Sequence, residues 1–520
     1  MDYEKNPKSD TAQAAADKAG ADIEIANTLS QQGDQDVAVT FLAGLDPSIT
    51  EKEVTKEEAR KVLWKIDLII LPLVAATIIL AAVDKVIISN AAIYGMREDA
   101  HLTSDQYSWV GSIFYFGYLV LEYPSAILIQ RLPVAKLLAG AVFSWGVIMM
   151  CIAATHNFGG LATCRFIMGM SEALIFPVSS ILTVMWWTRE EQPIRVAFWF
   201  NQGSSIFSGI ISYGIGHTHT SIAPWRLLFL VLGGYSFLWA VVIWFCLPDT
   251  PVTCRWLSAR EKYICLRRVK DNKTGIEDRK IKWYQIKECL TDPKTWALAT
   301  FAVAQNIPNG GLVTFAAIIV SGLGYSKLNT TLLGIPTGVL ATVWQLMLAF
   351  LCAHIPNIRC LTIAVANLVP MICAILMWKL PRDNKHGLLA AYYVFYTYWA
   401  PYVLATSLPM ANTSGHSKKV TMNAIFFVSY CLGNILGPQV FRSSDAPDYS
   451  HGYIGLLCCI VVAIGSIIVY GCLCFFENKR RAAAVVQANE LGAAHDTQED
   501  MIAAFQDLTD KEKKTFVYTY

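Results

Sequence analysis

The sequence has few charged residues and shows no pattern typical of an enzyme. Asp, Glu, Lys and Arg make up 16% of the 520 residues, whereas hydrophobic residues make up 54% and the mean hydropathy is +0.40. Soluble domains carry about 25% charged residues, so an ordinary soluble fold is excluded for most of the chain. The sequence contains no nucleophile–base pair, metal-ligand cluster or phosphate-binding loop, and it therefore does not predict an enzyme.

The cysteines and the net charge exclude further classes of protein. The 14 cysteines include no CxxC and mostly lie in apolar runs, as Cys431, Cys458 and Cys459 do, where cysteine packs as a small apolar residue. We therefore expect no disulfide framework, no metal site and no cofactor. The net charge is only +2 and the cations cluster in loops between apolar runs, so a nucleic-acid partner is not expected.

Long apolar runs take the place of charge in this sequence. A helix needs about 20 predominantly apolar residues to cross a bilayer. We predict an all-α membrane protein with twelve transmembrane helices in two six-helix halves, present as a monomer in the lipid bilayer. The twelve runs lie near residues 67–92, 107–129, 137–155, 158–187, 194–216, 226–247, 296–321, 330–353, 360–378, 387–410, 420–441 and 453–476.

The distribution of Lys and Arg predicts the orientation of the chain. Cytoplasmic loops carry an excess of these cations. Four of them precede the first run, at Lys56, Arg60, Lys61 and Lys65. The loop after the first run is mainly acidic, with Arg97 against Glu98, Asp99 and Asp105. The amino terminus is therefore predicted to be cytosolic, and an even number of spans returns the carboxyl terminus to the same side.

The tails and the central loop divide the chain into five predicted parts. Residues 1–50 are rich in Ala, Asp, Gln and Ser and lack the apolar core of a signal peptide, a composition typical of disorder. Twelve Lys and Arg fall within residues 248–294. The parts are a disordered cytosolic tail (1–60), the first half (61–247), a basic cytosolic loop (248–294), the second half (295–476) and a polar cytosolic tail (477–520) with at most a weak helix around 497–508.

Two loops repeat between the halves. QRLPVAK at 130–136 and AHIPNIR at 353–359 each place a cation three residues after a proline, at an offset of 223 residues. Transporters built from two related halves rock around a central site. The residues expected to brace the cytoplasmic gate are Glu122, Arg131, Lys136 and Arg359.

Asp84 and Lys85 stand side by side inside the first apolar run. An ionisable side chain at bilayer depth costs about 2.5–3.5 kcal/mol on insertion scales, so it usually has a function or a partner. From the helical rise, Asp84 lies about 24 Å from the cytoplasmic edge and Arg165 about 9 Å below the outer face, at similar heights. We expect an Asp84–Arg165 pair, either structural or functional, and expect Glu172, on the same face as Arg165, to titrate in transport together with Asp84.

The second half offers polar and aromatic groups in place of charge. The aromatic run at 392–399 is explained equally well as packing core or as a substrate wall. An anionic substrate is expected to meet Lys85 and Arg165. The further groups expected to bind it through hydrogen bonds are Asn201, Gln202, Asn306, Asn309, Tyr396 and Asn423.

Five separated motifs carry a family resemblance. They are YSWVGSIFYFGYLVLEYP (107–124), RFIMGMSEA (165–173), WWTREEQPIR (186–195), KWYQIKECLTDPKTW (282–296) and QNIPNGG (305–311). Over most of residues 60–480 the sequence resembles the allantoate permease group of fungal transporters, in the anion:cation symporter branch of the major facilitator superfamily. The resemblance implies the major facilitator fold and a plasma-membrane proton symporter that imports small organic anions such as allantoate, ureidosuccinate or vitamin-type carboxylates.

The resemblance also implies roles for the buried charges. In the wider branch, an acidic-basic pair on the first helix and an Arg/Glu pair seven residues apart on the fourth carry substrate and proton; these positions match Asp84, Lys85, Arg165 and Glu172. Alternating access is the expected mechanism. An exporter of a drug or secondary metabolite and a transporter-like nutrient sensor remain alternatives, although the fifth helix, 198–216, lacks the proline typical of many drug exporters.

Overall fold

The computed structural model describes most of the chain, and within the described residues all regular secondary structure is helical. Side chains are described for these residues except at 123, 126, 130, 193, 197 and 484–490. The described residues are 41, 45, 49, 54–188, 190–199, 203–269, 282–355, 357–441, 449–490, 508–513 and 516–520.

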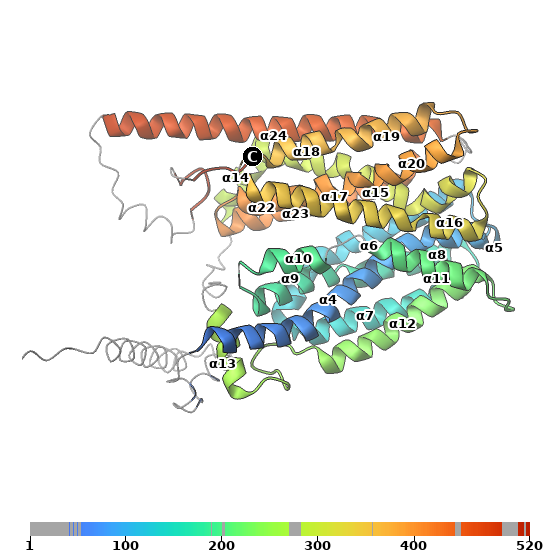
Figure 1. Ribbon diagram of the computed structural model, residues 1–520, viewed down its shortest axis with the longest axis horizontal. Helices are drawn as coiled ribbons and strands as arrows, with labels where there is room; N and C mark the ends of the chain where they lie inside the picture. The colour runs from blue at the N-terminus through green and yellow to red at the C-terminus, as the bar shows by residue number, and fades with distance from the viewer. Residues whose placement is uncertain are drawn as a thin grey trace, which may run out of the picture.

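The helices form two bundles that lie against each other (Figure 1). The first contains α4 (Lys56–Ala91), a π-helical turn (Ala92–Met96), α5 (Arg97–Asp99), α6 (Ser104–Arg131), α7 (Val134–Ile152), α8 (Phe158–Glu172), α9 (Ile175–Trp186), α10 (Gln192–Trp199), α11 (Ser204–Gly216) and α12 (Pro224–Cys246). The second contains α15 (Pro293–Gly322), α16 (Lys327–Leu333), α17 (Ile335–His354), α18 (Arg359–Ala366), α19 (Leu368–Lys379), α20 (Lys385–Phe395), a 3-10 turn (Tyr396–Tyr398), α21 (Trp399–Ala405), α22 (Ser407–Ala411), α23 (His416–Val440) and α24 (Ser450–Glu490).

Among the described residues, nine helices are long and apolar enough to cross a membrane. The chain is therefore a multi-pass membrane protein, as predicted. The other three predicted spans are also largely helical: α6 covers 107–129, α10 and α11 fall in 194–216, and the run 387–410 divides into α20, the 3-10 turn, α21 and α22. The count of twelve crossings remains a prediction.

Local sequence signals explain where the longest helices begin and end. Thr55 forms a capping box with Glu58 at the start of α4, and Thr103 forms one with Gln106 at the start of α6. These reciprocal hydrogen bonds satisfy backbone N–H groups that have no partner inside the helix. The π-helical turn after α4 contains Gly95, whose φ of 99° is a conformation that glycine adopts without strain.

The two bundles meet along α4, α6 and α11 of the first and α15, α16 and α23 of the second. Tyr107 Oη donates to Thr314 O at 2.6 Å, and Ser112 Oγ donates to Ile435 O at 2.7 Å. Gly111 permits this approach, since a Cβ there would lie 2.6 Å from Thr314 Oγ1. Helices α9, α10, α21 and α22 instead make their main contacts within their own bundles. The halves are thus joined toward the end that carries α5 and α16 (Figure 1).

The described parts of the central segment 248–294 form two helices, one on each half. Helix α13 (Ala259–Val269) packs on α4 and α9, and α14 (Trp283–Thr291) packs on α23 and α15. Arg268 Nη2 lies 2.7 Å from Glu191 Oε1, and an ion pair also joins Lys65 to Glu261. Both helices lie at the end of the molecule that the predicted orientation assigns to the cytoplasm.

Beyond the membrane helices, the chain continues differently from the simple polar tail expected. Helix α24 continues to Glu490, and residues 508–513 and 516–520 pack against the second half, with Tyr518 fully buried. Residues 491–507, which hold most of the weak helix expected at 497–508, lie outside the described residues, as do residues 1–40.

Candidate functional site

Asp84 and Lys85 point from α4 toward different partners, because neighbouring helical residues are about 100° apart around the axis. Trp145 Nε1, on α7, donates a hydrogen bond to Asp84 Oδ2 at 2.8 Å, and both side chains are buried. The expected Asp84–Arg165 pair was wrong: among the described residues no ion pair joins them. The two groups belong to one cluster but do not reach ion-pair distance, and the Asp84 carboxylate instead accepts the hydrogen bond of Trp145.

The ion pair of the site joins Lys85 to Glu172. Lys85 Nζ lies 2.6 Å from Glu172 Oε1, with the two side chains 22% and 2% exposed. The ammonium also lies 5.7 Å from the ring centre of Phe114 and 5.6 Å from that of Tyr118, within the range of cation–π attraction. Glu172 therefore has a basic partner, which comes from α4 and not from its own helix.

Arg165 is the least satisfied cation of the cluster. Its Nε makes one long hydrogen bond, 3.5 Å, to Val110 O, and its guanidinium lies 4.9 Å from the centre of the Phe114 ring. Its Nη1 is buried and has no hydrogen-bond partner among the described residues, and the same is true of Asp84 Oδ1 and Glu172 Oε2. Buried polar atoms are nearly always paired, so these three atoms mark positions for a ligand, a water or a proton.

A close contact between α6 and α8 positions Arg165 and Glu172. A Cβ on Gly169 would lie 2.0 Å from Phe114 O, and one on Gly117 would lie 1.9 Å from Phe166 O. Only glycine fits at these crossings, and small residues let membrane helices approach closely. The glycines of the motifs FYFGY and IMGMSE therefore hold the charged face of α8 against the aromatic face of α6.

The second half presents an aromatic surface to this cluster. Tyr430 on α23 lies edge-on to Tyr115 at 6.1 Å between ring centres, and it stacks on Tyr402 at 5.8 Å. Phe427, one turn earlier on α23, lies 5.4 Å from Tyr118. Sequence reasoning did not single out these rings or Trp145, although the motif YSWVGSIFYFGYLVLEYP contains two of the tyrosines.

The asparagines predicted on the seventh span are engaged inside the second half. Asn309 Oδ1 accepts from Tyr398 Oη at 2.9 Å, and its Nδ2 donates to Asn434 Oδ1 at 2.8 Å. Asn306 Nδ2 donates to Ala302 O at 2.7 Å. In this structure the Asn309 amide thus joins α15 to α23 and to the 3-10 turn, whereas the Asn306 amide bonds within α15.

The other predicted substrate residues either make no contact with the cluster among the described residues or lie outside the described part of the chain. The hydroxyl groups of Tyr396 and Tyr392 lie 3.2 Å apart. Asn423 is exposed and donates to Met410 Sδ at 3.1 Å. Asn201 and Gln202 are not among the described residues.

The four predicted gate residues occupy separate positions. Glu122 and Arg131 are nine residues apart on α6, about 14 Å along the axis, and no ion pair joins them among the described residues. Lys136 Nζ donates to Trp244 O, and Arg359 Nη1 donates to Ser407 Oγ at 3.4 Å. The repeat-related loops are thus each held within their own half.

Comparison with known proteins agrees with this architecture. Residues 73–438 match the Major Facilitator Superfamily. The chain is 35% identical over 484 residues to the allantoate permease of Saccharomyces cerevisiae, covering 90% of this chain and 88% of that protein. It is also 35% identical over 486 residues to the MFS-type transporter cnsL of Penicillium expansum, covering 94% of this chain and 93% of the relative.

A solved D-xylose-proton symporter shares the fold, with a TM-score of 0.57 at 14% identity over 76% of this chain and 96% of that one. The sequence relatives are named as a permease and a transporter, and they match almost from end to end. The chain therefore belongs to the Major Facilitator Superfamily and, within it, to the allantoate permease-like group of fungal transporters; it is a transporter and not an enzyme.

Proposed function

We propose that this transporter is a proton-coupled symporter that imports a small organic anion by alternating access. The observation that carries the proposal is the Lys85–Glu172 ion pair, 2.6 Å long and with its carboxylate buried, beside the Arg165 guanidinium, whose Nη1 has no partner among the described residues. A guanidinium with free donors suits a carboxylate, which it can bind through two parallel hydrogen bonds.

Competition for Lys85 would couple the substrate to a proton. A substrate carboxylate held by Arg165 also attracts the Lys85 ammonium and weakens its contact with Glu172. A buried carboxylate that loses its cation holds a proton more readily than a paired one. Binding of the anion and protonation of Glu172 therefore favour each other, whichever comes first.

The charge of the cluster supports a ratio of one proton to one monocarboxylate. Asp84 and Glu172 balance Lys85 and Arg165, so the empty site is formally neutral. A monoanion alone would leave a net negative charge in the bilayer core, where charge is costly. One proton on Glu172 restores neutrality, and the loaded carrier can then turn. Asp84, bonded to Trp145, is a second proposed proton position.

The substrate we propose is a carboxylate of the allantoate, ureidosuccinate or vitamin type, and the proposed location is the plasma membrane with both termini cytosolic. The named allantoate permease among the relatives supports the carboxylate class. The aromatic surface formed by Tyr115, Tyr402 and Tyr430 suits a planar group attached to the carboxylate.

The test is uptake of a panel of labelled small carboxylates into cells that lack their own carriers. We expect one member to accumulate, faster at acidic outside pH, with loss of accumulation on adding a protonophore. Lys327→Ala, at an exposed lysine outside the cluster, is the matched control for Lys85→Ala. Resistance to cationic toxins together with pH-independent uptake of every carboxylate would favour an exporter. Substrate binding without any flux would favour a nutrient sensor.

A further inference from the structure

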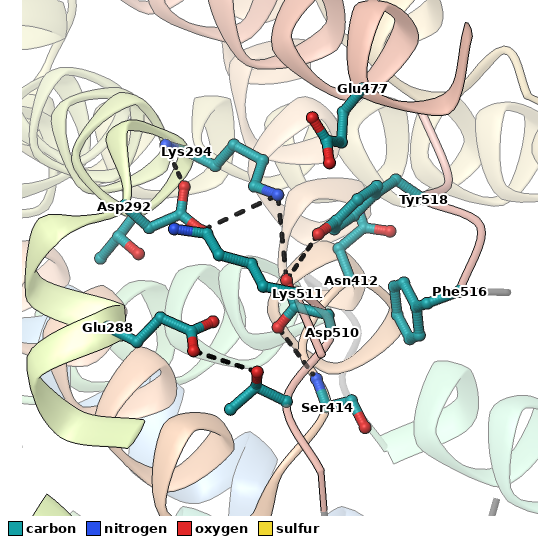
Figure 2. Close-up of polar contacts among 12 residues, drawn as sticks. Glu288, Asp292, Lys294, Asn412, Ser414, Glu477, Asp510, Lys511, Phe516 and Tyr518 are labelled. Carbon is teal, nitrogen blue, oxygen red and sulfur yellow. Dashed lines mark hydrogen bonds and ion pairs between the residues drawn. The ribbon is translucent and has the colours of Figure 1, made fainter. Parts of the chain in front are cut away.

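The last described residues of the chain pack into a site of charged and polar side chains on the second half (Figure 2). We name residues 508–513 and 516–520 the clasp. Thr509, Asp510 and Tyr518 are at most 1% exposed, although they lie within the last twelve residues. Tails of this kind are usually poorly ordered unless contacts fix them in place.

A buried lysine lies at the centre of the docking site. Lys418, at the start of α23, is 3% exposed. Its Nζ lies 2.7 Å from Asp510 Oδ1 of the clasp, 2.7 Å from Glu288 Oε1 and 3.6 Å from Asp292 Oδ2. Thr509 Oγ1 of the clasp also donates to Glu288 Oε2 at 3.0 Å. The clasp therefore supplies one of the carboxylates that surround the ammonium group of Lys418, a residue of the membrane bundle.

Tyr518 is the aromatic anchor of the clasp. Its Oη donates to Asp510 Oδ2 at 2.6 Å, and Lys294 Nζ lies 3.5 Å from the centre of its ring. Arg481 Nη2 of α24 also donates to Tyr518 Oη at 3.1 Å, with the guanidinium 4.8 Å from the ring centre. The ring thus contacts cations of both α15 and α24.

Two asparagines form the same pair of hydrogen bonds with the backbone of the clasp. Asn478 Oδ1 accepts from the N–H of Tyr518 at 2.9 Å, and its Nδ2 donates to Tyr518 O at 2.8 Å. Asn412 makes the same pair of bonds with the N–H and C=O of Thr519, both at 2.7 Å. The N–H of Arg359 donates to Tyr520 O at 3.1 Å. Such reciprocal bonds determine which clasp residue lies opposite each asparagine, and they also stabilise the docked clasp.

The charges of the site allow the clasp to leave. Without the clasp, Glu288 and Asp292 balance Lys294 and Lys418; the ion pairs of the docked clasp add Asp510, which is buried, and Lys511, whose side chain is 43% exposed. The groups that form these ion pairs are formally neutral together in both states, so undocking leaves no net charge among those that stay behind. Burial alone would raise the pKa of Asp510, but Lys418, Tyr518 and Lys294 lower it below its usual range, so the carboxylate is ionised when docked.

The docked clasp bridges elements that are distant in sequence. Its contacts reach α14, α15, α18, α23 and α24 and the C-cap residue of α22, all on the second half. In alternating access, one half moves against the other largely as a rigid body. The contacts of the clasp hold the helix ends of a single half together.

We propose that the clasp is a detachable brace, which docks on the helix ends of the second half and sets the turnover of the transporter by holding that half rigid. The clasp does not touch the charged cluster, so its release should lower the maximal rate and leave the half-saturation concentration for substrate unchanged. Docking itself does not depend on which substrate is carried.

Docking is tested by hydrogen exchange on the full chain in detergent. We expect the amides of Tyr518 and Thr519 to exchange about tenfold or more faster in Tyr518→Ala and in Lys418→Met than in the wild type. Val517→Ala is the matched control, because the Val517 side chain is 70% exposed. Equal exchange in all four proteins would overturn the docked state.

Detachability is tested with a chain truncated after residue 507 and a labelled peptide of sequence LTDKEKKTFVYTY. We expect saturable binding of this peptide, restored turnover, and no binding of the same peptide with Tyr518→Ala. Circular dichroism would verify that the truncated protein keeps its helical content. A folded truncated protein that transports at the wild-type rate, or that never binds the peptide, would refute the proposal.

Discussion

Replacing Lys85 with alanine should destabilise the protein as well as abolish uptake. The substitution removes the ammonium that lies 2.6 Å from Glu172 Oε1 and leaves a carboxylate whose side chain is 2% exposed. Removing one partner of a buried ion pair costs about 3–5 kcal/mol. Because the Lys85 side chain is itself 22% exposed, we expect the lower end, about 3 kcal/mol.

The double variant Lys85→Ala/Glu172→Gln separates this cost from lost packing. It removes both charges, so most of the stability lost in Lys85→Ala should return, while uptake stays absent. Unfolding of the four purified proteins in a mild detergent gives the coupling energy directly. Lys327→Ala, at an exposed lysine, should match the wild type in stability and uptake. A coupling energy near zero, or a Lys85→Ala protein as stable as the wild type, would refute the structural role of the pair.

Three further predictions concern the neighbours of the pair and the clasp. Trp145→Phe removes the donor to Asp84 Oδ2 and should lower the free energy of unfolding by about 1–3 kcal/mol in the same assay. An unchanged free energy of unfolding would show that this hydrogen bond does not stabilise the protein. Arg165→Lys keeps the charge but loses the fork of donors, so the substrate concentration for half-maximal uptake should rise at normal protein abundance; unchanged affinity would exclude Arg165 as the carboxylate ligand. The pKa of Asp510 is lowered in the docked clasp, so docking should be fully stable at pH values above the usual pKa of an aspartic acid side chain and be lost as the pH falls through the lowered pKa. Peptide binding that becomes weaker as the pH is raised through this range would contradict the prediction.

The sequence was sufficient to predict which charged residues form the cluster, but not which of them form ion pairs. Asp84, Lys85, Arg165 and Glu172 do gather, because ionisable side chains in membrane spans face a partner or a cavity. The rise per residue of a helix predicted the depths of these residues in the bilayer. Which helix each face of α4 contacts depends on how the helices pack, and the sequence alone does not give that. Trp145 was missed because a tryptophan in an apolar run is usually part of the core.

The remaining differences also have local causes. The predicted span at 387–410 is interrupted after Phe395, and its later part contains Pro401 and Pro409, which lack the N–H that a continuous helix needs. The clasp has the polar composition of a disordered tail, and its docking depends on Lys418 and Asn412, which lie about 100 residues away in sequence. The prediction of a polar tail did not take the aromatic ending FVYTY into account.

The most direct test of the account is to compare wild-type protein with Glu172→Gln in proteoliposomes that carry a proton gradient. Glutamine keeps the size of the side chain but cannot take up and release the coupled proton. We expect Glu172→Gln to lose uphill accumulation of the carboxylate while exchange between labelled and unlabelled substrate continues at a rate comparable to that of the wild type. Full gradient-driven accumulation by Glu172→Gln would contradict the claim that the Lys85–Glu172 pair couples substrate to proton.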